Sequence, residues 1–171
     1  MRRPRFFWTV ALLLPILHFL LRVGLGLGAW APDLLSVGLL LVAREVRPGP
    51  AAGLGFGLGL LEDAFSVLSF GANVMALTIL GIFGARSRDL FLGDSLVFLV
   101  SYLALGSWLR VALHWLFSGE GARTDLWDAL VVQGPMAAVY AAAAGTFVLL
   151  ATGAWSRGDI RTKHLPQDVA G

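Results

Sequence analysis

Two acidic residues follow a row of glycines in the segment GLGFGLGLLEDAF, which covers residues 53–65. Glycine occupies every second position from Gly53 to Gly59, and the acidic residues are Glu62 and Asp63. Such residues could form a phosphate-binding loop, a catalytic pair of carboxylates, or a surface for close helix packing. The sequence around the segment separates these alternatives.

A phosphate-binding loop needs neighbouring elements that this segment lacks. A dinucleotide loop follows a strand and opens a helix, and a Walker loop ends on Lys followed by Ser or Thr. Neither arrangement is present, because the glycines lie inside an apolar run that is preceded by Pro48, Gly49 and Pro50. We therefore expect no phosphate site here.

A catalytic pair of carboxylates is also disfavoured. Glu62 and Asp63 are adjacent, so on a helix their side chains point about 100° apart and do not face one substrate. No nearby histidine or serine has triad-like spacing. We expect Glu62 to be solvated at the end of a span. Asp63 is expected to have a structural role, accepting hydrogen bonds from the following turn or the next span.

Other polar side chains interrupt the apolar sequence. Asp33 precedes an apolar run, where a carboxylate favours the positive end of a helix dipole. Arg110 and His114 are four residues apart and share a helix face, and ionisable residues in membrane spans are functional candidates by default. We expect a structural or interfacial role for this pair, with Arg110 reaching toward the interface. Asn73 is expected to hydrogen-bond between helices.

The residue types offer no metal or cofactor site. The chain has no cysteine, which excludes disulfides, zinc–thiolate clusters and thiol nucleophiles. The histidines, His18, His114 and His164, lie far apart without metal-ligand spacing. We therefore expect no cofactor, no metal and no enzymatic activity, and we expect no nucleic-acid partner.

The elements that carry these residues are predicted from composition. Of the 171 residues, 57% are hydrophobic and only 14% are charged, and the mean hydropathy is +0.78. A soluble domain of this size needs a larger charged surface. The sequence therefore predicts an all-α integral membrane protein, a compact bundle of six transmembrane helices.

Six apolar segments within residues 1–155 are the candidate spans. They cover approximately residues 6–25, 32–43, 50–65, 73–85, 95–117 and 126–154, and a short cytoplasmic tail, residues 156–171, follows. A helix needs roughly 20 mostly apolar residues to cross a bilayer. The second and fourth segments are short by this measure, so a chain with five spans is an alternative.

The basic residues favour six spans over five. With six spans, most of them fall on one side of the membrane: Arg2, Arg3, Arg5, Arg44, Arg47, Arg86, Arg88, Arg157, Arg161 and Lys163. Removing one internal span would place basic clusters on opposite sides. The asymmetry fits the positive-inside rule with both termini in the cytoplasm.

The first span also has features of a signal peptide. It follows the basic sequence MRRPR, and Ala29, Trp30 and Ala31 resemble a cleavage site. However, its apolar run exceeds the usual signal core of about 7–15 residues. We therefore expect a retained transmembrane helix.

The glycine row suits helix packing. In a helix, Gly53 and Gly57 share one face, and Gly55 and Gly59 share another, which makes two G-x-x-x-G pairs. Small residues let helix backbones approach closely in lipid. We expect this helix to lie in the protein interior with more than one neighbour, and we assign Gly71 a packing role as well.

The same segment has a pattern of residues known from one family. A Gly-Phe pair is followed by Gly after three residues, Asp after four more and Gly after eight more. The matching residues are Gly55, Phe56, Gly59, Asp63 and Gly71. In this pattern, residues 55–76 resemble the rod shape-determining protein MreD family. The chain length, the six predicted spans and the cytoplasmic termini resemble the family too. Val67 and Glu62 depart from it, because Gly and an apolar residue are usual there.

The resemblance implies a non-enzymatic scaffold of the bacterial elongation complex, in the cytoplasmic membrane. Such a scaffold binds MreC through its membrane helices and outer face, and it helps to control cell shape and peptidoglycan synthesis. MreB, RodA and a penicillin-binding transpeptidase belong to the same assembly, and membrane lipid surrounds it.

The alternative is a substrate-binding membrane subunit of a vitamin-type transporter, because the family is similar in fold to transporter S-components. Such a subunit needs polar groups that converge on a cavity. Asp63 and Asn73 are candidates beside their structural roles. Candidates for partner or cavity contacts are Arg110, His114, Gln133 and Tyr140. An enzyme acting on a lipid substrate is a third interpretation.

Overall fold

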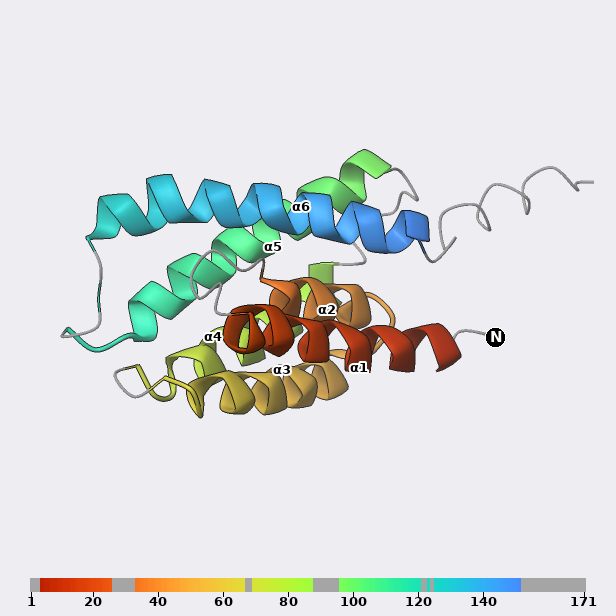
Figure 1. Ribbon diagram of the computed structural model, residues 1–171, viewed down its shortest axis with the longest axis horizontal. Helices are drawn as coiled ribbons and strands as arrows, with labels where there is room; N and C mark the ends of the chain where they lie inside the picture. The colour runs from red at the N-terminus through yellow and green to blue at the C-terminus, as the bar shows by residue number, and fades with distance from the viewer. Residues whose placement is uncertain are drawn as a thin grey trace, which may run out of the picture.

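The computed structural model describes residues 4–25, 33–66, 69–87, 96–120, 123 and 125–151. All regular structure in these ranges is helical (Figure 1). The α-helices are α1 (Pro4–Phe19), α2 (Leu34–Ala43), α3 (Pro48–Asp63), α4 (Ala72–Ser87), α5 (Leu96–Phe117) and α6 (Gly134–Ala151). Two π-helical segments, η1 (Leu20–Gly24) and η3 (Asp128–Gln133), continue α1 and precede α6. The fold is all-α. The predicted tail, residues 156–171, and the cleavage-like residues 29–31 lie outside the described ranges.

Each predicted apolar segment overlaps one α-helix, but the helices differ greatly in length. Within the described residues, two stretches are long and apolar enough to cross a membrane, Val97–Phe117 and Asp128–Phe147. Only 28% and 17% of the most apolar 18-residue window of these two stretches is buried. The ten residues of α2 rise only about 15 Å, roughly half of a hydrocarbon core.

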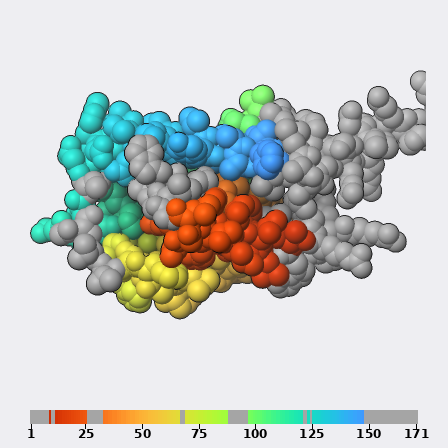
Figure 2. Space-filling model, in the orientation of Figure 1, coloured from red at the N-terminus to blue at the C-terminus, as the bar shows by residue number. Residues whose placement is uncertain are grey.

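The centre of the molecule is α2. Every residue of this helix is buried, and it contacts α1, α3, α4, α5 and α6. Its sequence LLSVGLLLVA is apolar on all sides, which is the pattern of a helix enclosed by others. The core around it includes Leu35, Leu39, Leu77 and Leu103. In Figure 2, α1 covers the middle of one face, between the surface of α3 and that of α6.

The closest helix pair is α3 with α4, and glycines make the approach possible. A Cβ atom added at Gly59 would lie 2.5 Å from the Val74 Cα atom, and one at Gly81 would lie 2.5 Å from the Ala51 carbonyl oxygen. An added Cβ at Gly55 would also collide with the α4 backbone at Leu77. The two backbones therefore touch directly, as small residues permit between membrane helices.

The structure corrects the expected role of the other glycines. An added Cβ at Gly53 or Gly57 meets nothing within 4 Å in the described structure, and both residues are exposed. Helix α3 is therefore packed on one side and open on the other, rather than enclosed. Gly71 also has open space around it, but its φ of +95° favours glycine. Its role is to form the turn before α4, not to pack.

The surface carries many large apolar side chains, and several charged and polar side chains are buried. Large apolar side chains on α1, α3, α4, α5 and α6 are exposed, among them Leu12, Ile16, Phe56, Leu61, Phe83, Val97, Leu105, Val139 and Phe147. Charged and polar side chains lie inside, among them Glu62, Asp63 and Asn73. An apolar exterior of this extent marks contact with lipid or with another protein.

Candidate functional site: a buried ion-pair network

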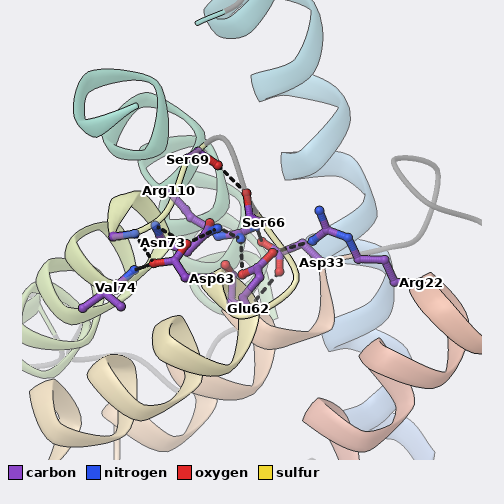
Figure 3. A network of polar contacts seen from close by, with 11 residues as sticks. Arg22, Asp33, Glu62, Asp63, Ser66, Ser69, Asn73, Val74 and Arg110 are labelled. Atoms are coloured by element: carbon purple, nitrogen blue, oxygen red, sulfur yellow. Dashed lines mark hydrogen bonds and ion pairs between the residues drawn. The ribbon is translucent and has the colours of Figure 1, made fainter. Parts of the chain in front are cut away.

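The guanidinium group of Arg110, on α5, is the centre of the polar interior (Figure 3). Its Nη1 donates to Asp33 Oδ2 at 2.6 Å, and its Nη2 donates to Glu62 Oε2 at 2.5 Å and to Asn73 Oδ1 at 3.1 Å. The arginine side chain is only 12% exposed. One side chain thus joins α5 to the start of α2, the end of α3 and the start of α4. Arg110 therefore forms buried ion pairs. The sequence had suggested instead that its side chain reaches toward the interface.

Glu62 bridges two arginines. Its Oε1 accepts a hydrogen bond from Arg22 Nη1, on η1, at 2.5 Å, while its Oε2 accepts from Arg110. The Glu62 side chain is 4% exposed and that of Arg22 is 43% exposed. The expected solvated position of Glu62 is therefore wrong. Its location between two guanidinium groups explains how a carboxylate can be buried here, since a buried charge needs partners of opposite sign.

Asp33 has two roles in the network. Its Oδ1 accepts a hydrogen bond from the backbone N–H of Ser36 at 3.1 Å, so the residue caps the N-terminus of α2. Its Oδ2 accepts from Arg110. The sequence predicted the cap, and the ion pair is an additional finding.

Asp63 anchors the start of α4. Its Oδ2 accepts from the backbone N–H groups of Gly71 at 2.9 Å and Val74 at 3.0 Å. Its Oδ1 accepts from the backbone N–H of Asn73 at 3.2 Å and from the Asn73 amide Nδ2 at 2.9 Å. The first N–H groups of a helix have no partner within it, and a carboxylate satisfies both them and the positive end of the dipole. Asp63 accepts from the turn and from the next helix, the two donors that the sequence suggested.

Asn73 connects the two parts of the site. Its amide Nδ2 donates to Asp63, while its Oδ1 accepts from Arg110. The side chain therefore hydrogen-bonds to α3 and α5 from its own position on α4. Asn73 is thus an uncharged link between two charged groups. One is the Asp63 carboxylate, which backbone N–H groups hold, and the other is the Arg110 guanidinium, which carboxylates hold.

Each charged side chain of the network faces its own set of partners. Asp33 and Glu62 face Arg110, and Glu62 also faces Arg22. The third acid, Asp63, has no ion pair among the described residues and is stabilised by four N–H donors at the start of a helix. Each of the three carboxylates of the network is thus engaged within the protein. This arrangement can fix four helices and η1 relative to one another.

The remaining candidate residues do not converge. Gln133, on η3, donates from its Nε2 to Asp128 Oδ2 at 2.6 Å, and Tyr140 lies on α6 with an exposed side chain. His114 and Gln133 line a separate small cavity, whereas Arg110 and Tyr140 do not. Of the four candidates for partner or cavity contacts, two therefore line this cavity and two do not.

The sequence interpretation missed the partners of Arg110. The signal was present as opposite charges near the ends of apolar segments, at Arg22, Asp33 and Glu62. No group of three His, Asp or Glu residues that could hold a metal occurs in the described part of the chain. No protein-family model, curated protein or solved structure matches the chain.

Proposed function

We propose that this protein is a multi-pass scaffold of a bacterial cytoplasmic membrane, of the rod shape-determining MreD type. The observation that carries the proposal is the inverted polarity: Arg110, Asp33 and Glu62 pair inside the bundle, while large apolar side chains cover its exterior. Ionisable groups in membrane proteins face the bundle interior and pair with one another. Lipid is the environment in which this exterior is stable.

Six membrane-embedded helices remain consistent with a ten-residue α2. A helix that is enclosed by other helices does not need to span the full thickness of the bilayer, because its ends are buried in protein. Arg44 and Arg47 lie between α2 and α3, and Arg86 lies in the last turn of α4, at the helix ends opposite the ion-pair network. This separation supports a cytoplasmic basic end, with both termini in the cytoplasm.

The α3–α4 hairpin supports the family resemblance. Gly55 and Gly59 form its backbone contact, and Asp63 and Gly71 form its turn. These four residues of the family pattern thus lie in one structural unit. In the proposed mechanism, the ion-pair network keeps the outer end of the bundle rigid. The apolar exterior then binds the single membrane helix of MreC.

The second candidate is a substrate-binding subunit of a transporter, and the cavity beside His114 and Gln133 favours it. Its volume is about 110 Å³. Pockets for drug-sized ligands hold about 300–1,000 Å³. A vitamin-sized ligand therefore does not fit this cavity as it stands, and the scaffold is the better-supported function.

Co-purification tests the proposal. The tagged chain is expressed with MreC from the same cells, extracted in mild detergent and captured, with an unrelated single-span protein as the control. We expect MreC, and not the control protein, in the eluate. Absence of MreC from a monodisperse, folded preparation contradicts the scaffold function. Reporter fusions at both termini test the topology separately, and an extracytoplasmic signal at either end contradicts it.

A further inference from the structure

A small cavity lies between the C-terminal part of α5 and the π-helical segment η3, apart from the ion-pair network. Its volume is about 110 Å³, and no residue of the network lines it. The polar side chains in its wall are His114, Ser118, Arg123 and Gln133. An engineered cavity of roughly 150 Å³ accepts a benzene ring, so this space suits a group of a few heavy atoms.

Arg123 is the charged residue of the cavity wall, and it is only partly used. Its Nε donates to the Ser118 carbonyl at 2.8 Å, and its Nη2 donates to the Leu116 carbonyl at 2.9 Å. Its guanidinium carbon lies 5.0 Å from the centroid of the Trp115 ring. Arg123 is an exposed residue, and these contacts orient its guanidinium, while Nη1 donates to no described residue. An oriented guanidinium with a free edge is suited to oxyanions.

Gln133 is the second group of the wall with unused hydrogen-bonding capacity. His114 also lines the cavity, but its Nδ1 atom has no surface open to a group bound there. The amide of Gln133 uses one N–H for Asp128 and retains a second. No acidic side chain is among the described residues that line the cavity, and the Asp128 carboxylate accepts the hydrogen bond from Gln133 Nε2. The wall therefore offers one full positive charge and neutral donors.

The π-helical segment η3 forms part of the cavity wall. Pro135 follows it closely and has no N–H to continue a regular ladder. Trp108, on α5, donates from its Nε1 to the Leu130 carbonyl at 3.0 Å, which ties η3 to α5 beside the cavity. π-helical turns are rare and frequently occur at functional sites.

We propose that this cavity binds a small oxyanionic group, a phosphate or carboxylate, through Arg123, with the second N–H of the Gln133 amide beside it. The group can belong to a free anion or to the headgroup of an anionic phospholipid, which presents the same phosphate chemistry at the membrane surface. This site is independent of the scaffold function and of any MreC interaction.

Thermal unfolding of the full chain tests the site with defined probes. Inorganic phosphate and acetate are added in detergent at matched ionic strength, against chloride. Separately, the chain is reconstituted into vesicles of phosphatidylglycerol or of phosphatidylcholine. The variants are Arg123→Gln, which removes the charge, and Ala129→Leu, which fills the cavity and keeps its polar groups. Arg86→Gln removes an exposed arginine elsewhere and is the matched control.

We expect a saturable rise in melting temperature for the wild type and for Arg86→Gln. In Arg123→Gln and Ala129→Leu, the apparent affinity falls about tenfold or more, the loss expected for one charge-assisted contact. A response to phosphate or acetate assigns a free anion, and a response to phosphatidylglycerol vesicles alone assigns a lipid headgroup. The proposal is overturned when no probe stabilises the wild type, or when Ala129→Leu responds like the wild type. Ala129→Leu keeps this test valid even where Arg123→Gln fails to fold.

Discussion

The two G-x-x-x-G pairs of α3 look equivalent in sequence and differ completely in structure. Gly55 and Gly59 lie against the backbone of α4, where an added side-chain atom has no space. Gly53 and Gly57 have open space around them. The packed side also leads to Glu62 and Asp63, which are both buried. A G-x-x-x-G pair therefore indicates where a helix can approach another closely, and only the fold decides whether one does so.

The largest effect is expected where the packed side of α3 ends in the ion-pair network. In Arg110→Met, Asp33 and Glu62 lose their shared buried partner, and breaking a buried ion pair costs about 3–5 kcal/mol. We expect a large loss of thermal stability in detergent, measured by tryptophan fluorescence. Arg86→Met, at an exposed site, is the control. Equal stability of Arg110→Met and wild type would show that the network does not hold the helices together.

A smaller but clear effect is expected at the backbone contact. Gly59→Ala adds one atom where α3 touches Val74, and overpacking of this kind costs about 1–3 kcal/mol. Gly59→Leu enlarges the same clash and should hinder folding and lower the melting temperature further. Yield and melting temperature measure both variants. An unchanged melting temperature for Gly59→Leu would mean that α3 and α4 do not meet at this point.

The turn between the two helices should respond more moderately. Asp63→Asn keeps an acceptor oxygen but replaces the other with an N–H₂ group, which faces the backbone donors of the turn. Leaving buried donors unsatisfied costs about 1–3 kcal/mol. Hydrogen exchange at the first turn of α4 should accelerate, whereas exchange in α5 should change less. Uniform acceleration across both helices would argue against a local role for Asp63.

The smallest effect is expected on the open side of α3. Gly53→Ala and Gly57→Ala add an atom where nothing lies within 4 Å, and Ala favours a helix over Gly by about 1 kcal/mol. Both variants should therefore be as stable as wild type or slightly more stable. A loss comparable to that of Gly59→Ala would show that the two sides do not differ as described.

A feature could be predicted from the sequence when the residues that determine it lie close together along the chain. The helices follow from continuous apolar segments, and the role of Asp63 follows from donors within eleven residues of it. Glu62 could not be interpreted in this way, because its partners lie 40 and 48 residues away. Local chemistry predicted a solvated acid there, whereas the tertiary arrangement provides two guanidinium groups.

The same limit applies to the small cavity. His114 and Gln133 were candidates because polar residues are rare in apolar segments, but nothing in their spacing separates them from Arg110 or Tyr140. Their shared location depends on how η3 packs against α5. The sequence did not single out Arg123, since its contact with Trp115 depends on the path of the chain after α5.

The enclosure of α2 has a consequence for how the protein is made. A ten-residue helix that contacts five others has no lipid-facing side with which to enter a membrane on its own. Its stable position requires that α3 to α6, which follow it in the chain, have already been synthesised. For the proposed membrane scaffold, we therefore expect insertion to be cooperative rather than sequential. Chains truncated after α2 should fail to retain that helix in the bilayer, although it is among the most apolar segments of the protein.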